Sequence, residues 1–298
     1  MLNNHEKMLQ QMKTGQGFIA ALDQSGGSTP KALKNYGIDE SQYSSEEEMF
    51  DLVHQMRTRI ITSPAFTNEH ILGAILFERT MLSKIEDRFT AEYLWEVKHI
   101  VPFLKVDRGL SPASNGVQLM NPIIDLSKEL VEAKKHNVFG TKMRSVIHNA
   151  DKIGIEQVVD QQFAIARGIA AAGLVPIIEP EVSIAAPDKA EAEDMLKDQV
   201  VQHLGKWDPD QPLMFKFTIP TKADLYADLY DYSAVVRIVA LSGGYSVDEA
   251  CDKLAENHNM PASFSRALLQ NLRADQTDTQ FNTALKKAIN KIYRASVN

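Results

Sequence analysis

The chain has 298 residues and a formal net charge of −7, and 44% of its residues are hydrophobic. No block of Lys and Arg stands out, which excludes nucleic acid and an anionic membrane as expected partners. The one cysteine, Cys251, excludes an internal disulfide and a cysteine metal cluster, and its helical pattern predicts a packed small residue. Residues 1–13 lack the apolar core of a signal peptide, so we expect a cytoplasmic protein.

Short apolar runs that end in a polar or charged residue recur along the chain, and helical patterns separate them. The predicted strands are 18–23, 71–78, 101–107, 138–144, 174–181, 213–219, 235–242 and, with the weakest pattern, 262–266. The predicted helices are 45–61, 155–172, 189–204, 246–256 and 279–293. Ser45 and Glu48 have the spacing of a capping box at the start of the first of these helices.

Near-continuous apolar strands that alternate with helices are typical of a parallel sheet covered on both sides. Eight such units in a chain of this length favour an α/β fold with a single (β/α)8 barrel. We expect one catalytic domain over residues 1–298, with a polar extension at 1–14 and a C-terminal helix at about 278–294. The first strand lacks the Gly-x-Gly-x-x-Gly of a dinucleotide-binding fold.

Active-site side chains of such barrels come from the carboxyl ends of the strands. The residues at these positions are mostly charged, and both signs occur: Asp23, Lys105, Asp107, Lys142, Arg144, Glu179, Glu181, Lys216, Ser242 and Arg266. Side chains alternate along a strand, so Lys142 and Arg144 should share one side, and so should Glu179 and Glu181. The carboxyl ends of the strands therefore predict a highly charged site.

Lys216 lies between two phenylalanines in a run that is otherwise almost entirely apolar. A buried amine with other cations nearby loses its proton more readily, and a neutral amine can attack a ketone carbonyl. Lys105 and Lys142 could supply those cations. For one buried lysine the alternative is a structural ion pair with a strand-end glutamate. Three strand lysines and an arginine at one barrel end favour a catalytic amine instead.

Two carboxylates flank Pro180 in the segment Glu179-Pro180-Glu181. Neighbouring like charges make one carboxylate easier to protonate, which suits general acid–base catalysis. The alternative is that one of them only neutralises the lysines, and we expect each residue to fill one of these two roles. Asp23 ends the first strand and could accept a hydroxyl proton, or it could be a turn or helix-capping residue.

Two glycine-bearing segments at strand ends are candidate anion sites. Ser242, Gly243 and Gly244 precede a helix, so their N–H groups can approach a phosphate closely, and Arg266 could complete that site. The other segment, 25–28, contains Ser25, two glycines and Ser28. One such turn is a weak signal, but two at the same barrel end indicate a ligand with two phosphates.

The sequence gives no indication of a metal cofactor. The eight histidines are scattered without the spacing of a metal site. Each cluster of carboxylates that could hold Mg²⁺ also contains lysines. This favours a protonated imine over a metal ion as the electron sink. We therefore expect no cofactor.

Six segments together resemble the class I fructose-bisphosphate aldolases, in their short bacterial form. The resemblance extends from about Gly15 to nearly the end of the chain. The segments are 20–28, 104–109, 141–144, 175–181, 241–244 and 263–268. One departure is Gln24, which stands where the better-known animal enzymes have Glu.

The resemblance implies roles for the strand-end residues. Lys216 is the Schiff-base lysine, Glu179 helps to dehydrate the carbinolamine, and Asp23 with Lys142 handles the proton of the hydroxyl next to the breaking bond. The ketone-side phosphate is held by Ser242, Gly243, Gly244 and Arg266. The other phosphate lies toward Ser25, Ser28 and Lys105, with Arg144 in support.

The implied activity is reversible cleavage of fructose 1,6-bisphosphate into dihydroxyacetone phosphate and glyceraldehyde 3-phosphate, in glycolysis and gluconeogenesis. A sugar phosphate is then the expected partner. Two alternatives stay open at this point: a Schiff-base aldolase of another phosphorylated sugar, and a non-catalytic barrel that binds sugar phosphates.

Overall fold

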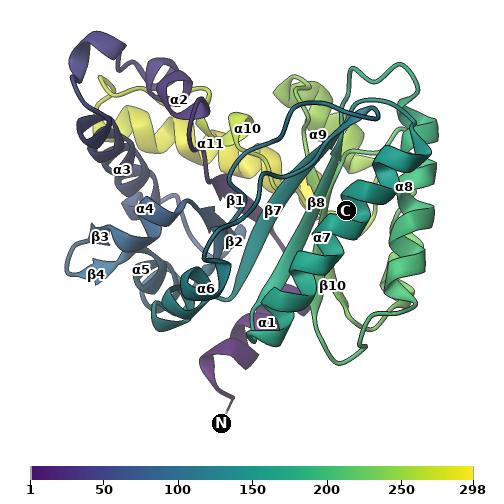
Figure 1. Cartoon of the computed structure of the whole chain (residues 1–298). Helices are drawn as coiled ribbons and strands as arrows, with labels where there is room; N and C mark the ends of the chain where they lie inside the picture. Colours follow the sequence, from purple (N-terminus) through teal and green to yellow (C-terminus); the bar gives the residue numbers. More distant parts are fainter. Residues whose placement is uncertain (1, 298) are drawn as a thin grey trace.

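The computed structural model describes residues 2–297, apart from the side chain of Ser28. A parallel sheet runs through the molecule in the order β1–β2–β5–β7–β8–β9–β10, and helices cover its outer side (Figure 1). The strands of this order are β1 (Phe18–Leu22), β2 (Ile71–Leu76), β5 (Val101–Lys105), β7 (Gly140–Ile147), β8 (Val175–Val182), β9 (Leu213–Thr218) and β10 (Val235–Leu241). Three short strands lie off it: β6 (Val117–Gln118), which pairs with β7, and the hairpin β3 (Lys84–Ile85) and β4 (Arg88–Phe89).

The two ends of this sheet meet through residues 261–263. Ala262 bridges to Ala240 of β10, and its carbonyl accepts a hydrogen bond from the N–H of Ile19 in β1 at 2.9 Å. The sheet therefore closes into a barrel, as predicted. The predicted eighth strand, 262–266, is wrong in its extent, because Ser265 has helical backbone angles and Arg266 already begins a short helix.

The predicted helices are all present, with ends shifted by a few residues. The helices along the chain are α1 (Asn4–Thr14), α2 (Ser28–Tyr36), α3 (Glu46–Thr62), α4 (Glu78–Leu82), α5 (Thr90–Glu96), α6 (Leu126–Lys135), α7 (Lys152–Ala171), α8 (Lys189–Leu204), α9 (Val247–Ala255), α10 (Arg266–Leu269) and α11 (Asp278–Ser296). Two 3-10 turns, η1 (Glu40–Gln42) and η2 (Ala227–Asp231), complete the set within residues 2–297. The capping box at α3 is only half formed, because Ser45 accepts from the N–H of Glu48 while the Glu48 carboxylate accepts from Ser44.

The N-terminal segment that we expected only as a polar extension folds into α1, which closes the bottom of the barrel. Met8 and Met12 are buried there against the barrel interior. The side-chain amide of Gln11 donates to the carbonyls of Leu72 and His99 at 3.0 and 2.9 Å. Figure 1 shows α1 at the opposite end of the sheet from α2, α9 and α10. The end with α2 and α10 is the carboxyl end of the strands, because α2 follows β1 and α9 follows β10.

Alternation along β9 separates Lys216 from its neighbours. Phe215 and Phe217 belong to the core between the sheet and the helices, whereas Met214 belongs to the core inside the barrel. Because side chains two residues apart share a side, Lys216 lies inside the barrel, above Met214. The flanking phenylalanines pack away from the amine and do not cover it.

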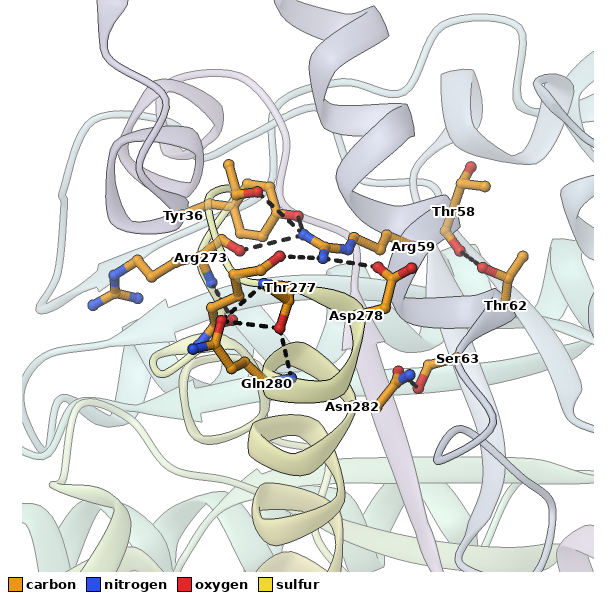
Figure 2. Close-up of polar contacts among 12 residues, drawn as sticks. Tyr36, Thr58, Arg59, Thr62, Ser63, Arg273, Thr277, Asp278, Gln280 and Asn282 are labelled. Carbon is orange, nitrogen blue, oxygen red and sulfur yellow. Dashed lines mark hydrogen bonds and ion pairs between the residues drawn. The ribbon is translucent and has the colours of Figure 1, made fainter.

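The last helix, α11, carries its predicted apolar face into the outer core, with Phe281, Leu285 and Ile289 buried. Arg59 of α3 fastens the start of this helix, as Figure 2 shows. Its guanidinium donates to the carbonyl of Gln276 at 2.6 Å and to Asp278 at 3.0 Å. No helix within residues 2–297 is long and apolar enough to cross a membrane.

Candidate active site

A cavity of about 920 Å³ opens at the carboxyl end of the strands. Twelve of the thirteen predicted site residues line it: Asp23, Ser25, Lys105, Lys142, Arg144, Glu179, Glu181, Lys216, Ser242, Gly243, Gly244 and Arg266. The thirteenth, Ser28, begins α2, and its side chain lies outside the described part of the structure. The structure thus brings together residues from the ends of six strands and, with Arg266, from the start of α10.

Glu179 occupies the centre of this site and is 3% exposed. One carboxylate oxygen lies 3.0 Å from the amine of Lys216, and the other lies 3.0 Å from the amine of Lys142. The N–H of Glu179 donates to the buried side chain of Gln162 at 2.9 Å, which fixes the backbone at this point. The carboxylate of Glu179 in β8 therefore bridges lysines of β7 and β9, the strands on either side of it.

Lys142 is surrounded by three carboxylates. Its amine lies 2.8 Å from Asp23 and 3.6 Å from Asp107, in addition to Glu179. Burial opposes its charge, but the carboxylates, Asp23 first, raise the pKa of Lys142 well above the ordinary value. Burial also opposes the charge on Asp23, yet Lys142 and then Lys216 outweigh that effect and hold the pKa of Asp23 well below its usual range. Asp23 is therefore ionised, and it does not cap α2, whose N-cap is Gly27.

Lys105 has its own partner in Asp107, whose carboxylate and main-chain carbonyl both lie 2.8 Å from the amine. Lys105 and Lys142, the cations expected beside Lys216, are thus each paired with carboxylates. Together with Lys216 they make three amines, and the carboxylates of Asp23, Asp107 and Glu179 match them in number. Asp107 is 5% exposed and also approaches Lys142. The sequence predicts Asp107 at a strand end but assigns it no role. Its position two residues after Lys105 indicates that both side chains point to the same side.

Glu181 has a different partner from Glu179. It accepts a hydrogen bond of 2.5 Å from Nε of Arg144. Burial opposes the charge on Arg144, but this hydrogen bond and the carboxylate charge raise the pKa of Arg144 above its ordinary value. As alternation predicted, Lys142 and Arg144 share one side of their strand, and so do Glu179 and Glu181. Glu179 pairs with lysines, whereas Glu181 pairs with Arg144.

The loop after β10 has the conformation that its glycines allow. Gly243 has a φ of +60°, and a Cβ there would meet Ile184 at 2.7 Å. Gly244 has a φ of +119°, and its carbonyl lies 3.4 Å from the guanidinium of Arg266. The loop and the arginine therefore form one wall of the cavity, with backbone N–H groups and a cation that suit an anion.

Further polar residues that were not predicted also line the cavity, among them Gln24, Lys31, Ser265 and Arg273. Gln24 donates from its side-chain amide to the hydroxyl of Ser265, across a gap of 241 residues in the chain. They lie in loops and on a helix, where a strand-end pattern gives no signal. Within residues 2–297, no three His, Cys, Asp or Glu side chains converge as metal ligands.

Comparisons with known proteins point in one direction. The family model described as "Glycolytic: Fructose-bisphosphate aldolase class-I" matches residues 4–219. A class 1 fructose-bisphosphate aldolase of Clostridium acetobutylicum is 56% identical over 98% of this chain and 99% of its own length. Its counterpart in Porphyromonas gingivalis is 54% identical over the same shares.

Two solved structures share the fold. A fructose-bisphosphate aldolase of Plasmodium falciparum, solved with TRAP and a small-molecule inhibitor, has a TM-score of 0.78 and 20% identity, covering 99% of this chain and 95% of its own. A Corynebacterium glutamicum protein has a TM-score of 0.56 and 14% identity, covering 98% and 92%.

Proposed function

The chain belongs to the class I fructose-bisphosphate aldolase family, and from this premise we propose that Lys216 is the amine that performs its chemistry. The enzyme reversibly cleaves fructose 1,6-bisphosphate into dihydroxyacetone phosphate and glyceraldehyde 3-phosphate. As a class I aldolase it works through a lysine Schiff base and without a metal cofactor.

The observation that carries the proposal is the contact between Lys216 and Glu179 inside the cavity. Glu179 can take a proton from the amine, and the neutral amine then attacks C2 of the ketose. The carbinolamine that forms must lose its hydroxyl as water. Protonated Glu179, 3.0 Å from the same nitrogen, is placed to supply the proton for this loss. The product is a protonated imine, with Glu179 ionised again.

Cleavage of the C3–C4 bond requires a base for the hydroxyl on C4. Asp23 is held ionised by Lys142, so it is in its basic form when the imine is ready. The electron pair of the C3–C4 bond moves toward the imine nitrogen as Asp23 receives the hydroxyl proton. Charged Lys142 can stabilise the negative charge that builds on the oxygen. The aldehyde leaves, and the enamine then gains a proton at C3 before hydrolysis.

The phosphates are assigned to the two walls of the cavity. The wall of Ser242, Gly243, Gly244 and Arg266 would hold the ketone-side phosphate, and Ser25, Ser28, Lys105 and Arg144 would serve the other end. Backbone N–H groups next to glycine and the guanidinium of Arg266, which lies beside the Gly244 carbonyl, support the first assignment. Such grips supply positioning, which lowers the entropic part of the barrier.

We also propose that residues 1–298 act as one catalytic domain in the cytoplasm. The support is the single cysteine, which is buried, and one closed sheet whose strand ends line the cavity. A negatively charged chain with a cationic cavity favours a small sugar phosphate over nucleic acid or a membrane as its partner.

Replacing Lys216 tests the proposal. Lys216→Met should abolish cleavage of fructose 1,6-bisphosphate in a protein that still folds, because the thioether fills similar space without an amine. Lys222→Met, at an exposed lysine beyond the same strand, is the matched control and should keep full activity. Steady-state assays with circular dichroism spectra of both variants decide the matter. Substantial turnover by folded Lys216→Met would refute the assignment.

A further inference from the structure

Arg57 of α3 is among the largest fully buried side chains, with 1% of its surface exposed. Its hydrogen bonds go to neutral groups. One end nitrogen donates to the hydroxyl of Thr80, and the other donates to the carbonyl oxygen of Gln24 at 2.6 Å and to its side-chain oxygen at 3.3 Å. Burial lowers the pKa of Arg57 only to about 10, so the group stays charged. Asp23 attracts this charge, but no carboxylate of residues 2–297 forms an ion pair with Arg57, and such a buried charge is costly, which calls for a reason to keep it.

Gln24 continues this set of contacts across the rim of the cavity. Its side-chain nitrogen donates to the carbonyl of Ala21 at 3.2 Å and to the hydroxyl of Ser265. An amide suits this place because its oxygen accepts from Arg57 while its nitrogen donates to two oxygens. Arg57, Gln24 and Ser265 therefore connect the loop after β1 with the segment that closes the barrel.

Each end of this connection is next to a residue of the proposed mechanism. Asp23 directly precedes Gln24, and Arg266 directly follows Ser265. A charged donor forms a stronger hydrogen bond to a carbonyl than a neutral one does, so Arg57 anchors the chain immediately after Asp23. The hydrogen bond from Gln24 also holds Ser265, which directly precedes Arg266 in the cavity wall.

We propose that Arg57 and Gln24 are positioning residues that hold Asp23 and Arg266 at a fixed separation. The proposal rests on the roles assigned above to those two residues. A base and a phosphate grip on one substrate must keep their spacing, because a misplacement of about 1 Å can cost as much as about 100-fold in rate. Arg57 itself does not line the cavity, so it acts through Gln24 and not on the substrate.

The central variant is Gln24→Met, which keeps the volume and removes both ends of the amide. We expect kcat for fructose 1,6-bisphosphate to fall and KM to rise, with kcat/KM lower by about 10-fold to 100-fold. Borohydride trapping with saturating dihydroxyacetone phosphate should still reach the wild-type extent, because Lys216 and Glu179 are untouched. Failure of trapping in the wild-type enzyme would overturn the proposed function, whereas normal trapping with unchanged kcat and KM in Gln24→Met would overturn only this inference.

Two conservative variants separate positioning from simple loss of stability. Gln24→Glu can still accept from Arg57, and the hydroxyl of Ser265 can donate to the carboxylate, so this variant should recover most of the kcat/KM lost in Gln24→Met. Arg57→Lys keeps the charge but cannot reach Thr80 and Gln24 together, and it should lose part of kcat. No recovery in Gln24→Glu, or wild-type kinetics in Arg57→Lys, would contradict the proposal.

Arg59→Met is the matched control, since Arg59 lies two residues further along the same helix and also donates to main-chain carbonyls (Figure 2). It does not line the cavity. We expect its melting temperature to fall while kcat and KM of the folded enzyme stay at wild-type values. Equal kinetic losses in Arg59→Met and Gln24→Met would show that the effect is a general loosening of the α3 region and would overturn the proposal.

Discussion

Lys216 of β9 and Lys189, whose amine contacts the end of β9, are each buried and paired with a glutamate, but of these two pairs only the first faces the cavity. Lys216 and Glu179 meet inside the barrel and line the cavity. Lys189 and Glu193 meet within α8, where the lysine amine also donates to the carbonyl of Ile219 at 2.9 Å, and neither lines the cavity. The difference lies in the surroundings and not in burial, since all four side chains are buried.

The Lys189 pair is closed on itself. The amine uses all three of its donors, on Glu193, on the carbonyl of Ile219 and on the hydroxyl of Thr221 at 3.2 Å. The second oxygen of Glu193 accepts from the N–H of Thr221 at 2.9 Å. This arrangement fastens the end of β9 and leaves no atom for a ligand. Of these two buried lysine–glutamate pairs, only Lys216 and Glu179 thus lie where a ligand in the cavity could reach the nitrogen.

The largest expected difference between the two pairs is in turnover. Glu179→Gln cannot take a proton from Lys216 or return one to the carbinolamine, so kcat should fall about 100-fold to 10,000-fold. Glu193→Gln makes the same substitution in the closed pair and should keep the kcat of the folded enzyme. Steady-state kinetics on both variants provide the measurement. If both variants lost turnover to the same degree, the distinction between the pairs would fail.

For stability we expect the reverse: loss of the Lys189–Glu193 pair should lower the free energy of unfolding and leave turnover unchanged. Lys189→Met leaves Glu193 buried without its cation, which should lower the free energy of unfolding by about 3–5 kcal/mol. The folded fraction should keep its kcat, because the cavity is untouched. Lys197→Met on the same helix removes a partly exposed ion pair with Asp228 and should cost about 1 kcal/mol or less. Urea denaturation measures both, and a Lys189→Met enzyme as stable as wild type would contradict this account.

A further difference concerns a carboxylate outside both pairs. Glu129 of α6 lies 2.9 Å from Arg108, yet burial, which outweighs that attraction, raises the pKa of Glu129 to about 7. The folded state then binds more protons than the unfolded state between an ordinary value of 4.5 and about 7. The stability from this group is therefore present at low pH and is lost as the pH rises through that window.

Glu129→Gln should remove this part of the pH dependence. The free energy of unfolding of the wild type should decline more than that of the variant between about pH 5 and about pH 8. Since Glu129 does not line the cavity, the pH profile of kcat should be the same in both. A variant that changed the kcat profile instead would show that this carboxylate belongs to the catalytic cluster.

The sequence predicted the barrel and most of the site because both depend on local patterns. Apolar runs between helices predict parallel strands, and alternation correctly placed Lys142 with Arg144 and Glu179 with Glu181 inside the barrel. Which carboxylate meets which cation depends on the stagger between strands. The pairing of Glu181 with Arg144 and not with a lysine therefore could not be predicted from one sequence.

Contacts between distant segments were also beyond prediction. Gln24 and Ser265 come together only because residues 261–263 close the barrel between β1 and β10. That closing segment is short because the chain turns into a helix at Ser265. The composition of residues 262–266 resembles a strand and gives no sign of this turn. The N-terminal helix was missed for a related reason: its polar composition hides the two methionines, Met8 and Met12, that fill the bottom of the barrel.

The most direct test of the central claim is to locate the covalent intermediate. Sodium borohydride added with dihydroxyacetone phosphate should reduce the imine to a stable amine. Because trypsin cannot cut after a modified lysine, the adduct should appear by mass spectrometry in the uncut peptide 207–222, which contains Lys216. An adduct on Lys142 or Lys105, or no adduct at all, would contradict the assignment of Lys216 as the Schiff-base amine.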